Sequence, residues 1–153
     1  NDSPTRKNVA IVLQQGLKEL GIELEIQELE WGAYLEKTAA GEHDMFILGW
    51  SNATGDADYG LYALFHSSQH GEPGNRSFYT NEKVDELLEA GRREADLTAR
   101  EGIYKEAMQL LTDDAPMAFV LHPSILTGVA NNVSGFYVTS DSMYHLKDVK
   151  ITE

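Results

Sequence analysis

Two aspartates two residues apart, Asp56 and Asp58, are the first candidates for chemistry in this sequence. In an extended loop their carboxylates would point the same way, as paired catalytic acids or metal ligands need. In the other interpretation, Asp56 caps a helix that starts near Ala57, and Asp58 lies in its first turn, where the helix dipole favours negative charge. A calcium-binding loop of the EF-hand type would also need a glycine and a distal glutamate, but aromatic and apolar residues follow Asp58. The pattern favours the capping role.

Other catalytic signatures are missing from the sequence. His66 and His70 are four residues apart, but the residues between and after them favour a loop over a helical zinc pair. No serine lies in a G-x-S-x-G elbow, and no phosphate-binding glycine pattern occurs. The absence of cysteine excludes disulfides, thiolate metal sites and a cysteine nucleophile. We therefore expect no catalytic residue, no metal and no cofactor. The rival hypothesis is a metal-assisted hydrolase that uses Asp56 and Asp58 with His66 or His70.

Trp50 points to binding. It ends a short apolar run, residues 44–50, that is typical of a strand buried on both faces. In open α/β sheets, ligands bind outside the carboxyl ends of the strands. A tryptophan there offers an apolar wall and one N–H donor, and the stretch SNAT, residues 51–54, adds small side chains and backbone groups that can hydrogen-bond a peptide-like ligand. These residues favour binding over bond making.

The elements that must position these residues alternate along the first third of the chain. Ser3 and Pro4 begin a helix that Gly21 ends, and a second helix at residues 31–40 ends at Gly41. Residues 22–29 alternate apolar and acidic side chains, as in a strand with one wet face. The order helix, strand, helix, strand implies a right-handed parallel crossover.

The rest of the chain is predicted to hold two helices and several strands. Residues 66–77 have the composition of a long exposed loop. Helices follow at about 82–94, with Val84, Leu87 and Leu88 facing inward, and at about 98–112. Strands are predicted at 116–123, which we expect to be buried, at 124–130 and at 144–152. The last strands lack obvious partners in the preceding helices, so they either join the sheet or belong to a neighbouring lobe.

The net charge limits which kinds of partner the chain can bind. The 153 residues carry 12 basic and 25 acidic side chains, a net charge of −13. Such a surface repels phosphate backbones, so we expect no nucleic-acid partner. No apolar run approaches the roughly 20 residues that span a bilayer.

Taken in order, these signals match a known family. From Arg6 to Trp50 the chain resembles the carboxyl-terminal lobe of bacterial extracellular solute-binding proteins of the peptide, dipeptide and nickel ABC-importer group. The first half matches in a helix that ends in Leu-Gly-Ile, then Glu30-Trp31, Tyr34-Leu35, Asp44 and Gly49-Trp50. The second half matches in Asn75, Phe78-Tyr79-Thr80-Asn81, Val84-Asp85-Glu86-Leu87-Leu88, Arg100, Tyr104 and Asp114-Ala115-Pro116.

The resemblance implies a fold and a cellular role. The expected fold is α/β, a lobe like those of type II periplasmic binding proteins, with a mixed sheet flanked by helices, as a fragment of a two-lobed protein. Residues 1–123 would form the carboxyl-terminal ligand-binding lobe, and residues 124–153 would return to a missing amino-terminal lobe. The whole protein would lie in the periplasm or on the outer face of the cell membrane, with a lipid anchor if the source is Gram-positive. It would enclose a solute between two lobes and deliver it to the membrane permease of an ABC importer.

The resemblance also implies a binding site. Trp31 and Trp50 match the family's cleft tryptophans, and Ser51 matches a residue beside the ligand backbone. The predicted ligand-binding residues are Trp31, Trp50, Ser51, Asn52, Thr54 and Asn75.

One position departs from the family. Peptide-binding members often carry an aspartate three residues after the tryptophan of the Gly-Trp pair, where it holds the peptide's amino terminus; here that position is Ala53. The run GWSNATGDADYGL instead looks like the glutathione-binding branch. The predicted ligand is therefore an oligopeptide, a dipeptide or glutathione. A third hypothesis is a stand-alone α/β interaction module whose final strands complete its own sheet.

Overall fold

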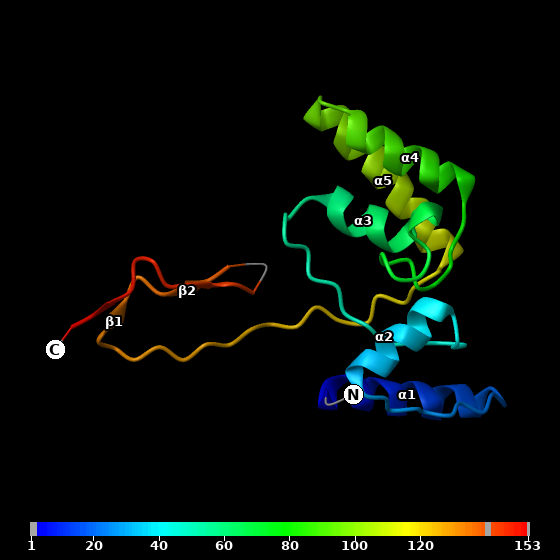
Figure 1. Cartoon of the computed structure of the whole chain (residues 1–153), viewed down its shortest axis with the longest axis horizontal. Helices are drawn as coiled ribbons and strands as arrows, with labels where there is room; N and C mark the ends of the chain where they lie inside the picture. The colour runs from blue at the N-terminus through cyan, green and yellow to red at the C-terminus, as the bar shows by residue number, and fades with distance from the viewer. Residues whose placement is uncertain (1–2, 140–141, 153) are drawn as a thin grey trace. The chain divides into compact units, whose positions relative to one another are not determined.

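A computed structural model describes residues 3–139 and 142–152 of the chain. Its helices and strands are α1 (Pro4–Glu19), α2 (Trp31–Ala40), α3 (Ala57–Phe65), the 3-10 turn η1 (Ser67–Gln69), α4 (Glu82–Arg93), α5 (Leu97–Asp114), β1 (Val133–Ser134), β2 (Tyr137–Val138), β3 (Tyr144–His145) and β4 (Lys150–Ile151). Figure 1 labels the five α-helices, β1 and β2. The chain divides into two compact units. Unit 1 comprises Asn1–Gly49 and Ala63–Asn81, and unit 2 comprises Trp50–Tyr62 and Glu82–Glu153.

The first two helices of unit 1 begin and end where local sequence signals predict. The Ser3 hydroxyl caps α1 by accepting from the backbone N–H of Arg6 at 3.4 Å, and Gly21, with φ of 77°, follows the helix. At α2 the Glu30 carboxylate accepts from the next free N–H groups, at 2.8 Å from that of Gly32, and Gly41 ends the helix with φ of 75°. Both predicted helices are confirmed.

The strands predicted at residues 22–29 and 44–50 are wrong: neither segment is hydrogen-bonded as a strand. The predicted alternation is seen in side-chain burial alone: Leu24 and Ile26 are half-buried, and their neighbours are exposed. A strand needs a neighbouring strand for its backbone groups, and the described residues supply none here. Side chains from the helices take that place: Gln14 Nε2 donates to the Leu24 carbonyl and Tyr34 Oη to the Ile47 carbonyl, each at 2.7 Å. The predicted mixed sheet is therefore not formed among the described residues.

The loop predicted at residues 66–77 is partly interior. Gly71, Gly74, Asn75 and Arg76 are buried. Both glycines meet backbone closely, since a Cβ on Gly71 would lie 2.7 Å from the Ala39 carbonyl oxygen and one on Gly74 would lie 2.5 Å from that of Ala63. The expectation of an exposed loop is wrong at these positions, because the composition of a tight, close-packed turn resembles that of a solvated one.

Unit 2 is built on the antiparallel pair α4 and α5, which lie side by side in Figure 1. The side chain of Asp96 caps α5 by accepting from the Ala99 N–H at 2.8 Å. The apolar face of each helix is buried, as predicted for α4; the buried residues are Val84, Leu87 and Leu88 of α4 and Tyr104, Ala107 and Leu111 of α5. A close approach between the two helices occurs at Gly91, where an added Cβ would lie 2.6 Å from the Tyr104 ring.

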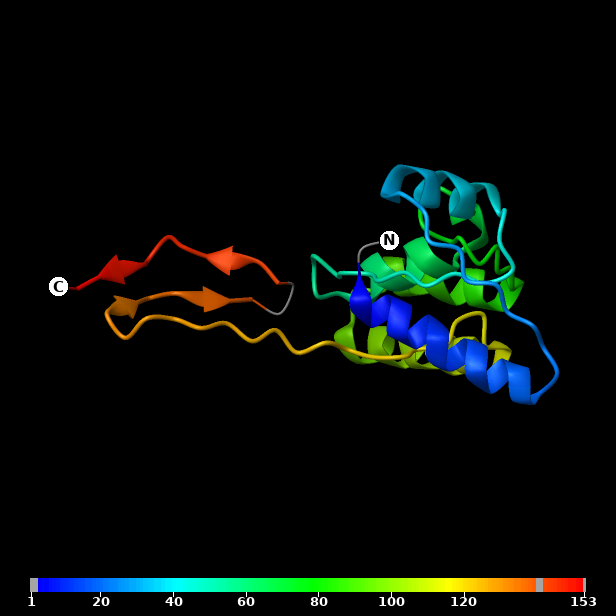
Figure 2. The ribbon, with the colours of Figure 1, turned by 90° about the horizontal axis from the view of Figure 1, so that it is seen from below.

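After α5 the predicted strands at 116–123 and 124–130 are wrong: residues 118–130 have no regular structure, and Phe119 and Leu126 are 72% and 95% exposed. No layer of the described chain covers these apolar side chains. The final residues form two short antiparallel ladders (Figure 2), β1 with β4 and β2 with β3, so the strand predicted at 144–152 is confirmed in part. The division at residue 123 stays a prediction. None of the described helices is both long and apolar enough to cross a bilayer.

Candidate functional site

Trp50 is the first residue of a loop that leads into α3. Its side chain is 40% exposed, and its ring centroid lies 5.8 Å from that of Tyr59 at a tilt of 41°. Gly60 faces the indole so closely that an added Cβ would lie 3.7 Å from its Cδ1 and Nε1 atoms. The start of α3 therefore supports the indole while leaving part of it open to a ligand.

The polar residues after Trp50 divide into two groups. Asn52 and Thr54 build the loop: Asn52 Nδ2 donates to the Asp56 carbonyl at 2.7 Å, and Asn52 Oδ1 accepts from the N–H and hydroxyl of Thr54 at 3.2 and 3.1 Å. Ser51 is exposed, and its hydroxyl has no hydrogen-bond partner within the part of the chain that the structure describes. Of the three, Ser51 is the side chain that the loop's own hydrogen bonds do not use.

The aspartates take the structural role. Asp56 Oδ1 accepts from the Asp58 N–H at 2.8 Å, as a cap of α3 does, so the capping prediction is confirmed. Arg100 donates to both Asp56 oxygens, at 2.7 and 2.8 Å, and Arg92 Nε lies 3.2 Å from Asp58 Oδ1. The guanidinium of Arg100, with the Asp58 N–H, lowers the pKa of Asp56 to about 2. Each carboxylate is thus paired with an arginine and is not set up as a catalytic acid.

The histidines of the hydrolase hypothesis lie in unit 1, whereas both aspartates lie in unit 2. His66 is buried, and its Nδ1 accepts from the Ser68 N–H at 3.1 Å to start η1. His70 Nε2 lies 3.0 Å from the Tyr79 carbonyl oxygen. Among the described residues no three side chains of the metal-binding types gather in one place. The arrangement gives the hydrolase hypothesis no support.

Trp31 offers a second open aromatic surface, in unit 1. It is the first residue of α2, is 41% exposed and stacks on Tyr34 with centroids 5.7 Å apart and planes 12° apart. The Tyr34 hydroxyl is fixed on the Ile47 carbonyl, and burial raises the pKa of Tyr34. Trp31 therefore rests on a ring that is itself held in place.

Asn75 is fully buried, and its amide is saturated. Nδ2 donates to the carbonyls of His66 and Tyr79, at 3.1 and 2.9 Å. Oδ1 accepts from the Tyr79 N–H and the Ser77 hydroxyl, at 3.2 and 3.0 Å. The amide organises its own loop, so its role as a ligand residue stays a prediction that this geometry does not support.

Sequence reasoning missed the role of Arg100 as the partner of Asp56. A signal was available, because Arg100, Tyr104, Ala107 and Leu111 recur at helical spacing and so share one face of α5. A basic residue on the face that carries a buried stripe is expected to have an acidic partner.

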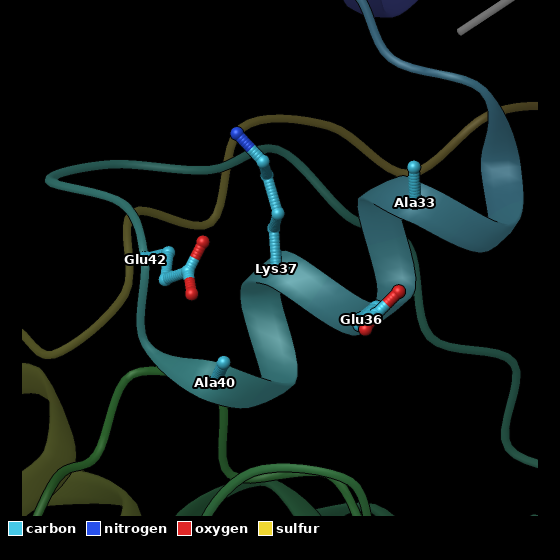
Figure 3. A pocket seen from close by; sticks show the side chains of 5 residues that line it. All are labelled: Ala33, Glu36, Lys37, Ala40 and Glu42. Atoms are coloured by element: carbon cyan, nitrogen blue, oxygen red, sulfur yellow. The ribbon is translucent and has the colours of Figure 1, made fainter.

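A shallow hollow of about 260 Å³ lies along α2, lined by Ala33, Glu36, Lys37, Ala40 and Glu42 (Figure 3). None of the predicted ligand residues lines it. Its lining has no aromatic wall, unlike the mostly apolar pockets that hold small molecules. It is not the predicted site.

Similar proteins of known family include several solute-binding proteins. Residues 1–72 match the middle segment of the bacterial extracellular solute-binding proteins, family 5. The dipeptide-binding protein of Escherichia coli is 27% identical over 149 residues, which cover 97% of this chain and 28% of that protein. These matches support a segment of a family 5 solute-binding protein. A further relative, the glutathione-binding protein of Pectobacterium atrosepticum, is 28% identical over 155 residues, covering 97% of this chain and 30% of that protein. The chain spans less than a third of the length of either relative.

Solved structures support the predicted fold class of the chain. The periplasmic binding protein DppA from Helicobacter pylori, solved with the peptide STSA, is 36% identical and gives a TM-score of 0.66, over 74% of this chain and 22% of that one. HbpA2 from Haemophilus parasuis, at 23% identity, gives a TM-score of 0.73 over 95% of this chain and 29% of that one, and supports the fold alone.

Proposed function

We propose that this chain is part of the solute-binding component of an ABC importer, and that the solute is a peptide-like small molecule. The observation that carries the proposal is Trp50: a half-exposed indole braced by Tyr59 and Gly60, with the open hydroxyl of Ser51 beside it in sequence. Among the relatives of the chain are proteins named for dipeptide and glutathione binding.

The chemistry of the site is recognition. The indole of Trp50 supplies an apolar wall and one N–H donor, and Ser51 with the exposed loop backbone supplies groups that pair with peptide amides. Trp31, itself half-exposed in unit 1, stays a predicted ligand residue. No bond needs to be made or broken, so the chain works as a binding protein and not as an enzyme. The whole protein would capture the solute by closure of two lobes.

The ligand's amino group needs an anchor other than the usual one. Ala53 stands where related peptide-binding proteins often have an aspartate, and the two acids that follow are already paired with Arg100 and Arg92. A peptide α-amine therefore finds no unpaired carboxylate among residues 50–58. This favours a ligand such as glutathione, whose γ-linkage presents its amine differently, over an ordinary dipeptide or oligopeptide.

The remaining partners follow from the family. The protein would act at the periplasmic or extracellular face of a bacterial membrane, with an amino-terminal lobe supplying the other wall of the site and a membrane permease receiving the solute. A lipid anchor is expected if the source is Gram-positive.

A ligand panel tests the proposal. The product of the whole gene is titrated by calorimetry with dipeptides, tripeptides, the same peptides with acetylated amines, and glutathione. We expect saturable one-to-one binding of at least one peptide-like solute, with glutathione ahead of ordinary dipeptides. Binding of none of them would reject the ligand class.

A further inference from the structure

Arg100 ties the two helices of unit 2 to the loop that carries Trp50. Its Nη1 and Nη2 donate to the two oxygens of Asp56 at 2.8 and 2.7 Å, a bidentate pair. Its Nε donates to the Gly91 carbonyl of α4 at 2.9 Å, and its guanidinium lies 4.9 Å from the ring centroid of Tyr104 on α5. Contacts with both helices thus hold the Arg100 guanidinium in the orientation that pairs with the Asp56 carboxylate.

Asp56 passes this restraint on to the loop. Besides its bond to the Asp58 N–H, its own N–H donates to Thr54 Oγ1 at 3.2 Å, and its carbonyl accepts from Asn52 Nδ2 at 2.7 Å. An added Cβ on Gly60 would meet the Trp50 indole at 3.7 Å and Asn52 Nδ2 at 3.9 Å, so these two side chains lie over the same glycine. Fixing Asp56 therefore fixes the surface on which the indole rests.

Little else holds the loop. Ser51, Ala53, Thr54 and Gly55 are all exposed, and an added Cβ on Gly55 would meet nothing within 4 Å. Burial of apolar surface therefore contributes little to the order of residues 51–55, in contrast to Trp50, which packs on Tyr59 and Gly60. Charge-assisted bidentate hydrogen bonds are about twice as strong as neutral ones, so this pair is the strongest restraint the loop has.

We propose that Arg100 is a positioning residue for the ligand site: through Asp56 it holds the Trp50 loop in its binding form without touching the ligand. The effect on affinity rests on the proposed function, whereas the effect on Trp50 does not.

The first experiment follows Trp50 without any ligand. Trp31→Phe leaves Trp50 as the single tryptophan of the chain, and acrylamide quenching then measures how open its indole is. We expect Arg100→Gln to raise the quenching constant about twofold, with helix content by circular dichroism unchanged. Arg100→Lys keeps the charge but loses the bidentate guanidinium, so its quenching constant should lie between those of wild type and Arg100→Gln. Arg93→Gln is the matched control, because Arg93 is 76% exposed and, among the residues that the structure describes, pairs along α4 with Glu89.

A double-mutant cycle assigns the effect to the pair. Asp56→Asn removes the charge while keeping an oxygen that can cap α3, so it should match Arg100→Gln, and the double variant should be no worse than either single variant. Additive effects would overturn the proposal, and so would quenching of Arg100→Gln equal to that of the Arg93→Gln control.

The second experiment measures affinity in the whole protein with Trp31 intact. Arg100→Gln should weaken binding of the peptide-like solute about five- to tenfold, whereas Arg93→Gln should leave it unchanged. Equal affinities for the two variants would overturn the link to the ligand site. If wild type binds no member of the panel, the proposed function fails, and the quenching comparison still decides whether Arg100 positions the loop.

Discussion

Replacing Asn75 by alanine should destabilise unit 1. The fully buried amide makes four hydrogen bonds, two donated and two accepted. At about 1 kcal/mol net for each neutral bond, their loss amounts to about 4 kcal/mol. Water can reach the half-buried Ser77 and Tyr79 and restore part of this. We therefore expect Asn75→Ala to lower the free energy of unfolding by about 2 to 3 kcal/mol.

Urea denaturation measures this loss with a reporter in the same unit. Trp50→Phe leaves Trp31, which belongs to unit 1, as the only tryptophan. Ser77→Ala is the matched control, because it removes one of the four bonds and should cost about 1 kcal/mol or less. An Asn75→Ala protein within about 0.5 kcal/mol of its parent, or no less stable than Ser77→Ala, would refute the assignment of Asn75 as the organiser of this loop.

Two further predictions concern unit 2. Gly91→Ala places a Cβ 2.6 Å from the buried Tyr104 ring and should lower the free energy of unfolding by about 1 to 3 kcal/mol, measured in thermal melts. Gly102→Ala is the control: its Cβ meets nothing within 4 Å, so it should raise the free energy of unfolding by up to about 1 kcal/mol. Similar shifts for both variants would contradict the close helix contact. Because the pKa of Asp56 is lowered from 3.8 to about 2 in the folded chain, its pairing stabilises the fold above pH 4, and this contribution is lost as the pH falls toward 2. The difference in stability between wild type and Asp56→Asn should shrink over that interval, and a constant difference would contradict the ion pair.

The helices could be predicted from sequence because their signals are local. Ser3 and Pro4 start α1, Gly41 ends α2, and Asp56 caps α3, each within a few residues of the backbone groups it serves. The stripe of Val84, Leu87 and Leu88 correctly predicts the buried face of α4.

The strands could not be predicted in the same way, because a strand depends on its neighbours. The apolar alternation at residues 22–29 predicts which side chains turn inward, but pairing needs a second strand, and the described chain provides none for it. The same holds for Phe119 and Leu126: their apolar pattern predicts burial, but no described part of the chain covers them.

The structure shows the surroundings of the predicted ligand residues. Trp50 and Trp31 are half-exposed aromatic residues, as a ligand surface requires, yet their use by a ligand stays a prediction. Asn75 could not be told from a ligand residue, since a polar residue in a glycine-rich loop has the same composition in either role. The Asp56–Arg100 pair joins residues 44 positions apart, so no local pattern specifies it.

The central claim, that the Trp50 loop binds a peptide-like solute, is tested most directly by calorimetric titration of Trp50→Ala in the whole protein. The solute is the member of the peptide and glutathione panel that binds wild type best, and Lys18→Ala on α1 is the control. Loss of the indole wall should weaken binding about a hundredfold or more while circular dichroism stays that of the wild type. An affinity for Trp50→Ala within about twofold of wild type would contradict the account.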